Sequence, residues 1–253
     1  MRQVWWRSCA VVLMAVALVG AGTPAADRPM PVSTANVRNT TTTTGVVSSP
    51  SFAAVGALFR DGAHFCTASV VDSPIGDLVL TAAHCVQAGT DLSFAPGYHD
   101  GVAPYGMWTV TGVLVPDGWT ATADPDLDFA FLTVRQAGNP EPVQDLTGGE
   151  ELGVNRGFAN DVTLVGYPGD APSPVICRNT TTQAFAYQQR IACPGFPDGT
   201  SGGPWLTAVD PLTGSGVVVG VIGGYEQGGD TPDVSYSAYF DEDIHTLFDA
   251  AVR

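Results

Sequence analysis

The chain has 253 residues, of which 45% are hydrophobic and 14% are charged, and its formal net charge is −15. This hydrophobic content excludes an intrinsically disordered chain, and the length fits one all-β domain. The sequence contains no lysine, so its positive charge rests on ten arginines, and a nucleic-acid partner, which requires a basic surface, is not expected.

Residues 1–26 have the pattern of a secretion signal. Arg2 and Arg7 precede an uncharged apolar run, residues 10–20, and small residues follow as far as Ala26. A membrane span needs about 20 apolar residues, so this shorter run predicts a cleaved signal peptide rather than an anchor. We therefore expect a secreted, extracellular protein that leaves the membrane after cleavage.

Residues 27–50 contain few large apolar side chains and include five consecutive threonines, Thr40–Thr44. Such a segment cannot bury enough surface to form a core. It is interpreted as a pro-segment or flexible linker, and the folded domain is expected at residues 51–253.

Four cysteines remain once Cys9 has left with the signal: Cys66, Cys85, Cys177 and Cys193. An even number in an exported chain predicts two disulfides, for which three pairings are possible. The sequence has no Cys-x-x-Cys spacing, and an oxidising compartment favours disulfides, so both observations argue against a metal site.

Short apolar segments separated by Gly and Pro turns predict strands along most of the domain. The predicted strands cover residues 52–59, 66–71, 78–81, 105–115, 129–134, 162–165, 182–193, 203–209, 216–223 and 234–239. Helical periodicity is seen at the C-terminal segment alone, where Ile244, Leu247, Phe248 and Ala251 fall on one face after three acidic residues, Asp241–Asp243. The pattern predicts an all-β barrel protein with a C-terminal helix.

The first candidate catalytic segment is Gly199–Pro204, which places Ser201 between glycines. Glycines allow the sharp bend that a nucleophilic serine needs, and they let a substrate carbonyl come close. Two earlier motifs accompany this one, Thr81–Cys85 around His84 and Asp128–Leu132. In the order His, Asp, Ser, the three motifs resemble those of the trypsin-like serine proteases, and specifically of their short bacterial secreted branch.

The resemblance covers about residues 52–250 and implies two six-stranded antiparallel β-barrels with the active site in the cleft between them. It also implies a disulfide between Cys66 and Cys85 and another between Cys177 and Cys193. No cofactor is expected.

The resemblance assigns a catalytic role to one residue of each motif. Ser201 is the expected nucleophile, and His84 is the expected base, because a neutral imidazole has its pKa near working pH. Asp128 meets the family pattern of Asp, apolar, Ala, apolar and is expected to orient His84. Asp124 and Asp126 are expected to be loop acids; a calcium site is disfavoured because the Gly and Glu of a calcium loop are missing.

The same resemblance places the oxyanion hole at the backbone N–H groups of Gly199 and Ser201. It places the substrate's main chain against the edge segment Gly223, Gly224 and Tyr225, in the manner of an added β-strand. Thr200 stands where animal enzymes carry the aspartate that receives a new N-terminus, so activation by N-terminal insertion is not expected.

Cleavage preference stays open. Gly195 stands where trypsin carries the acid that selects Arg and Lys, although Asp198 and Glu226 are near enough to supply negative charge. Ile222 and its neighbour stand where relatives that cut after Glu carry a histidine. Tyr225 would favour small side chains if it filled the pocket.

We therefore expect a secreted, monomeric serine endopeptidase that hydrolyses protein or peptide substrates through an acyl-enzyme. One alternative is a catalytically silent binding module, which the presence of His84, Asp128 and Ser201 argues against. Another is an esterase or a narrow-specificity hydrolase built on the same three residues.

Overall fold

The computed structural model describes residues 41–43, 52–86 and 91–253. The predicted signal peptide, residues 1–26, lies outside the described residues, and so does the predicted pro-segment apart from Thr41–Thr43. These three residues form strand β1 (Thr41–Thr43), which pairs antiparallel with β10 (Val175–Thr180). Within the described part of the chain, no helix has the length and hydropathy to span a bilayer.

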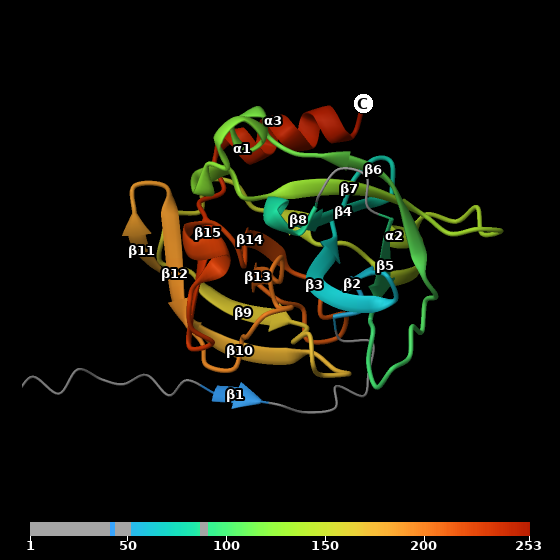
Figure 1. Ribbon diagram of the computed structural model, residues 1–253, viewed down its shortest axis with the longest axis horizontal. Helices are drawn as coiled ribbons and strands as arrows, with labels where there is room; N and C mark the ends of the chain where they lie inside the picture. The colour runs from blue at the N-terminus through green and yellow to red at the C-terminus, as the bar shows by residue number, and fades with distance from the viewer. Residues whose placement is uncertain (1–40, 44–51, 87–90) are drawn as a thin grey trace, which may run out of the picture. The chain divides into compact units, whose positions relative to one another are not determined.

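The first half of the domain is a closed antiparallel barrel of six strands in the order β2-β3-β4-β7-β6-β5 (Figure 1). Its strands are β2 (Val55–Arg60), β3 (Ala63–Val70), β4 (Leu78–Thr81), β5 (Leu92–Pro96), β6 (Trp108–Leu114) and β7 (Ala130–Arg135). Closure pairs every strand on both sides and removes the free edges of an open sheet.

The second half consists of two sheets. A six-stranded sheet has the order β1-β10-β9-β13-β14-β8, and a three-stranded sheet has the order β11-β12-β15. The remaining strands are β8 (Glu151–Leu152), β9 (Asp161–Gly166), β11 (Thr182–Phe185), β12 (Gln188–Ala192), β13 (Pro204–Thr207), β14 (Val217–Val221) and β15 (Val234–Ala238).

Hydrogen bonds outside the ladders join these two sheets. The N–H of Gly223, which lies just after β14, donates to the carbonyl of Tyr236 on β15 over 3.0 Å. Gln189 of β12 donates from Nε2 to the carbonyl of Val219 on β14 over 2.7 Å. The predicted all-β fold of two barrels with a C-terminal helix is confirmed. In the second barrel, these hydrogen bonds join the two sheets where no continuous strand ladder does.

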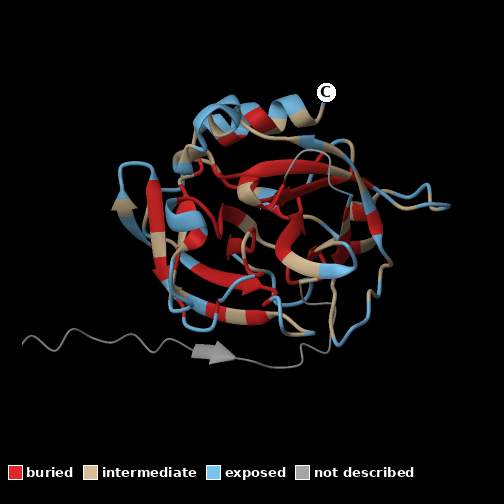
Figure 2. Ribbon diagram, viewed as in Figure 1, coloured by how far each residue is buried: buried red, intermediate tan, exposed pale blue. Residues whose placement is uncertain are grey.

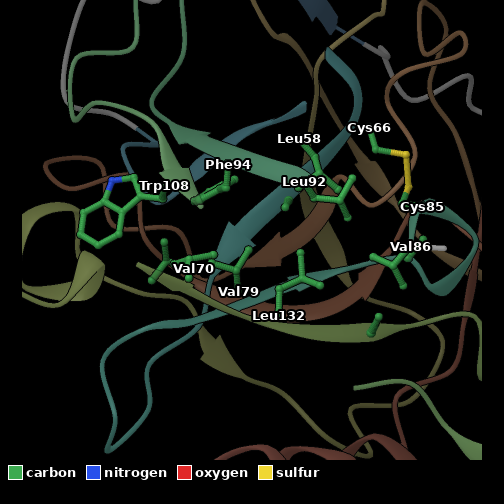
Figure 3. Packing of buried hydrophobic residues seen from close by; sticks show 14 of the residues in the cluster. Leu58, Cys66, Val70, Val79, Cys85, Val86, Leu92, Phe94, Trp108 and Leu132 are labelled. Carbon is green, nitrogen blue, oxygen red and sulfur yellow. A yellow bond between two sulfur atoms is a disulfide. The ribbon is translucent and has the colours of Figure 1, made fainter. Parts of the chain in front are cut away.

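Strand alternation divides the apolar residues of the first barrel between two cores. Val79 and Leu132 face the barrel interior together with Leu58, Val70 and Phe94, and all five are fully buried (Figure 3). Alternate residues on the same strands face outward and are equally buried, because the second half of the domain covers them. Strands buried on both faces explain the continuous apolar runs in the sequence.

The outward-facing residues form the core between the two halves. Leu80 and Phe131 of the first half pack in one cluster with Leu206 and Val221 of the second. Helix α3 (Glu242–Ala251) adds Ile244 to this cluster, and its exposed outer side is visible in Figure 2. The two halves therefore pack against each other through a buried apolar layer.

The structure differs from the sequence prediction in several elements. Strands β1, β5, β8 and β10 were not predicted, and the strand predicted at residues 182–193 is the hairpin of β11 and β12. The expectation that helix is confined to the C-terminus was wrong, because α1 (Asp117–Thr122) and α2 (Val143–Thr147) are also helical. Both have fewer than two full turns, so they show no apolar periodicity.

Glu150 is a fully buried acid where β8 meets the end of β3. Its N–H donates to the carbonyl of Val70, and its own carbonyl accepts from Asp72. Side-chain Oε2 accepts the N–H of Gly216 over 2.6 Å, whereas Oε1 has no partner among the described residues. Burial raises the pKa of the Glu150 carboxyl to about 8, against the opposing effect of the Gly216 hydrogen bond.

This raised pKa makes the stability of the fold depend on pH. Because the folded state holds the Glu150 proton up to about pH 8 and the unfolded state loses it near 4.5, the free energy of unfolding should fall as pH rises between these values, with a slope of up to about 1.4 kcal/mol per pH unit. Glu150→Gln should remove this component. Urea unfolding of both proteins at pH 5 and pH 8 measures the difference, and an identical pH dependence would contradict it.

Candidate active site

Strand β4 delivers His84. All four residues of β4 are buried, and the chain then turns through Ala82 into a short 3-10 helix, Ala83–Cys85. The disulfide Cys66–Cys85, with an S–S distance of 2.02 Å, ties this helix to β3. His84 is held on a rigid base with 11% of its side chain exposed.

A second 3-10 helix, Pro125–Leu127, delivers Asp128. The carboxylate of Asp124 caps this helix by accepting the N–H of Asp126 over 3.0 Å, and Pro125 occupies the first position, where its missing N–H costs nothing. Asp126 in turn accepts from Nε2 of Gln188 over 2.7 Å. Asp124 and Asp126, which precede the Asp128 motif, therefore both accept hydrogen bonds that hold this part of the chain in place.

The Asp128 carboxylate is fully buried and accepts three N–H groups. Oδ1 accepts the backbone N–H of His84 over 2.9 Å. Oδ2 lies 2.7 Å from Nδ1 of His84 and accepts the N–H of Gly224 over 2.8 Å. Since a carboxylate accepts hydrogen bonds, Nδ1 of His84 carries a proton, and in the neutral imidazole Nε2 therefore has the lone pair.

The loop that carries Ser201 is fixed at four consecutive peptide planes. The carbonyl of Asp198 accepts the N–H of Gly169 over 2.9 Å, and the carbonyl of Thr200 accepts the N–H of Gly203 over 2.9 Å. The two other planes are held through Thr67 of β3. Its hydroxyl donates to the carbonyl of Gly199 over 3.1 Å, and its N–H donates to the carbonyl of Ser201 over 2.7 Å.

These bonds orient the N–H groups of the loop. In a trans peptide the C=O and N–H point in opposite directions, so fixing the carbonyls of Asp198 and Thr200 directs the N–H groups of Gly199 and Ser201 the other way. Within the described part of the chain, neither of these two N–H groups has an acceptor. Gly199 adopts a φ of +96°, which a residue with a side chain rarely reaches.

His84 and Ser201 line one cleft of about 770 Å³. Both halves of the domain contribute to it: Arg60 and Phe65 come from the first half, and Ile222 comes from the second. Four carboxylates also line the cleft, on Asp170, Asp198, Glu226 and Asp230. The cleft is therefore acidic apart from the Arg60 guanidinium, which lies 4.0 Å from the ring centroid of Phe65.

Some of the residues considered for substrate specificity line the cleft, and others do not. Asp198, Glu226 and Ile222 line the cleft. Gly195 is not among the lining residues, whereas its neighbour Phe196 is. The ring of Tyr225 packs between Phe185 and Tyr236, with centroid distances of 5.0 and 5.1 Å. Tyr225 is thus held by tilted and edge-on contacts with these two rings, and it is not among the residues that line the cleft.

The backbone N–H groups of the predicted substrate edge are used within the protein. Gly223 donates to Tyr236 and Gly224 to Asp128, and Tyr225 donates to Oε1 of Gln188 over 3.1 Å. Among the carbonyl groups, that of Gly224 accepts the N–H of Gln227 over 2.9 Å, and Tyr225 begins the 3-10 helix Tyr225–Gly228. Within the described part of the chain, the Gly223 carbonyl is the group of this edge that remains for main-chain pairing with a peptide.

Sequence reasoning missed Thr67 and Gln188. Gln188 lies in β12 with 2% of its surface exposed, and its amide joins the edge at Tyr225 to the loop before Asp128. Neither residue stands in a motif, and each acts on a segment more than thirty positions away. The second disulfide, Cys177–Cys193, is also present, with an S–S distance of 2.04 Å.

The close packing at Gly202 predicts that this position tolerates no side chain. A Cβ there would overlap the carbonyl oxygen of Thr67 and the hydroxyl of Thr81, and Gly202 has a φ of +80°. We expect Gly202→Ala to lower the free energy of unfolding by about 2–4 kcal/mol, from backbone strain plus overpacking.

Gly157→Ala is the matched control, because Gly157 has a φ of +72° with nothing within 4 Å of an added Cβ. It should show the backbone cost alone, about 1 kcal/mol. Denaturant unfolding measures both variants, and equal losses of stability would contradict the packing argument.

Comparison with known proteins agrees with this geometry. Residues 66–221 match the model of the trypsin-like peptidase domain. Curated protein sequences give no significant match. Among solved structures, the chain resembles the protease Anisep from Arthrobacter nicotinovorans at 25% sequence identity and a TM-score of 0.70, over 81% of this chain and 97% of that protease.

Two further structures share the fold. The thermostable serine protease AL20 from an extremophilic microorganism has 24% identity and a TM-score of 0.71, covering 81% of this chain and 99% of its own. A Glu endopeptidase has 19% identity and a TM-score of 0.67, covering 84% and 95%. With the family match spanning well over half of its length, the chain belongs to the trypsin-like peptidases.

Proposed function

We propose that the protein is a secreted serine endopeptidase in which Ser201, His84 and Asp128 form the catalytic triad. The observation that carries this proposal is the buried Asp128 carboxylate, which binds Nδ1 of His84 over 2.7 Å at the wall of the cleft that Ser201 also lines. Burial of an acid without a cationic partner is costly, and its three N–H donors offset that cost.

The proposed reaction has two halves. Oγ of Ser201 attacks the scissile carbonyl carbon while its proton moves to Nε2 of His84. The tetrahedral intermediate collapses as the C–N bond breaks, and His84 returns the proton to the leaving amine. A water molecule then attacks the acyl-enzyme ester with the same assistance from His84, releasing the acid and restoring Ser201.

The N–H groups of Gly199 and Ser201 are the proposed oxyanion donors. They are directed by fixed carbonyls and have no acceptor within the described residues, so they are available to the oxygen that gains charge during attack. Donors already in place stabilise this charge without reorganisation, which is the main source of their effect on rate.

Among the described residues, the loop is held by hydrogen bonds, and Thr200 offers no charge for an ion pair with a new N-terminus. Thr200 is buried, and its hydroxyl donates to the carbonyl of Pro197 over 2.7 Å. We propose that removal of the signal and of any pro-segment uncovers a site whose geometry is already set by these hydrogen bonds. The two disulfides support export to an oxidising compartment.

The substrate is proposed to be a protein or peptide that lies along the cleft. It meets the edge Gly223, Gly224 and Tyr225 chiefly at the Gly223 carbonyl, which accepts a main-chain N–H of the substrate. The acidic lining favours cationic segments through long-range attraction.

Labelling by a fluorophosphonate probe tests the activated serine. The processed protein should be labelled, and both Ser201→Ala and His84→Ala should lose labelling, because the first lacks the nucleophile and the second lacks its base. Ser215→Ala, which changes an unrelated serine, is the control and should be labelled normally. Folded, processed protein that is not labelled would overturn the proposed mechanism and favour a silent binding module.

The role of Asp128 predicts a separate loss. Asp128→Asn should lower kcat about 10³- to 10⁴-fold on a peptide anilide, with little change in KM, because an amide N–H facing His84 favours the wrong tautomer. Asp126→Asn is the matched control, since its side-chain oxygen still accepts from Gln188. It should keep kcat within a few-fold, and equal losses in the two variants would contradict a specific role for Asp128.

A further inference from the structure

Thr67 is a buried residue of β3 whose hydrogen bonds reach from the first half of the domain to the loop that carries Ser201. We propose that the Thr67 hydroxyl is a positioning group for the oxyanion hole, because it holds the Gly199–Thr200 peptide plane, which lies between the two planes that carry the N–H donors of Gly199 and Ser201. This inference rests on the proposed function, and it adds a residue outside the three catalytic motifs.

The hydroxyl has one orientation available to its proton. Oγ1 of Thr67 accepts the N–H of Tyr167 over 2.8 Å, and it lies 3.1 Å from the carbonyl of Gly199. Because the Tyr167 N–H occupies one lone pair, the hydroxyl proton points to the Gly199 carbonyl. The Thr67 side chain therefore joins three segments: β3, the residue that follows β9, and the serine loop.

The Gly199 peptide needs such a restraint. Gly199 has a φ of +96° and no side chain, and Gly202 on the far side of Ser201 has a φ of +80°. Glycines rotate readily about both backbone bonds, so the planes between them are the part of the loop that turns most easily. The plane that Thr67 holds carries the Gly199 carbonyl and the Thr200 N–H, which donates to the carbonyl of Pro197 over 3.2 Å. Rotation of this plane changes ψ of Gly199 and φ of Thr200, so the two flanking planes, which carry the oxyanion donors, would turn out of position.

Thr67 also links the nucleophile to the base. Its carbonyl accepts the hydroxyl of Thr81 over 2.8 Å, and Thr81 ends β4 three residues before His84. Its N–H donates to the carbonyl of Ser201 over 2.7 Å. The backbone of Thr67 thus relates the two reacting side chains, while its hydroxyl restrains the peptide plane between the two oxyanion donors.

Thr67→Val tests the hydroxyl, because valine keeps the shape and removes the hydrogen bonds. We expect kcat on a peptide anilide to fall about 10- to 100-fold, which is less than the loss of a direct oxyanion donor. KM should stay within about two-fold, because the ground-state carbonyl depends little on the hole. Binding of a peptide trifluoromethyl ketone, which mimics the tetrahedral intermediate, should weaken by the same factor as kcat/KM.

Two further variants separate positioning from stability. Thr67→Ser retains the hydroxyl and should keep kcat within a few-fold. Thr181→Val is the matched control, because buried Thr181 also donates to a backbone carbonyl, that of Phe158, and accepts a backbone N–H, that of Asn160. It should lose thermal stability as Thr67→Val does while keeping kcat and inhibitor affinity.

The outcomes distinguish this inference from the proposed function. Active wild-type protein combined with an unchanged kcat in folded Thr67→Val would overturn the role of Thr67 alone. A matching loss in Thr181→Val would overturn it as well, because the effect would follow stability. Wild-type protein without activity would overturn the proposed function and the inference together. If Thr67→Val does not fold, Thr67→Ala replaces it with the same expected loss.

Discussion

The buried carboxylate of Asp128 is the constraint on which the arrangement of the two halves depends. A carboxylate without solvent must be supplied with donors, and those around Asp128 come from His84 in the first half and Gly224 in the second. Of the three bonds, the one from Gly224 crosses between the halves, so the set is complete when both halves are packed. The same requirement brings the imidazole to the wall of the cleft and fixes its tautomer.

The Gly224 bond has a consequence for substrate recognition. To reach Oδ2 of Asp128, Gly224 adopts a φ of +78°, and a Cβ there would overlap Oε1 of Gln188. The chain then enters a tight turn in which Glu226 and Gln227 also have positive φ. Because the N–H groups of this edge donate within the protein, they are not available to a peptide. The edge is therefore suited to short contacts near Ser201 rather than to a long β-ladder with the substrate.

Elements with local chemical signatures were predictable from the sequence. The segments around His84, Asp128 and Ser201 stand out because the chemistry requires particular residues side by side, and the strands that carry them are continuous apolar runs. Strand β5, by contrast, mixes Ser93 and Pro96 with its apolar residues and is defined by pairing with β2 and β6. The short helices α1 and α2 are set by turns and tertiary contacts rather than by periodicity.

The residues that hold the catalytic groups in place could not be predicted from the sequence, because they too are defined by tertiary contacts. Thr67 and Gln188 act through side-chain bonds to segments that are distant in the sequence, and an ordinary threonine or glutamine in a strand carries no sign of this. Glu150 looks like a surface acid in the sequence, yet the packing of β8 against the end of β3 buries it completely. What a motif specifies is the reacting group; what holds that group depends on the whole fold.

The serine loop shows how far such support extends. In the animal enzymes that the sequence resembles, an aspartate beside the serine is held by a new N-terminus; here Thr200 takes that place and bonds locally to Pro197. The loop is then anchored by Gly169 and by Thr67, from opposite halves of the domain. In the part of the chain that the structure describes, these hydrogen bonds hold the loop, and Thr200 has no charge with which an N-terminus could pair. On the proposed mechanism, Gly169 and Gly203 of the second half direct the two oxyanion donors, and the bonds from Thr67 add the remaining anchors of the loop when the two halves are packed. The packing that completes the donors around Asp128 therefore also completes the support of Ser201.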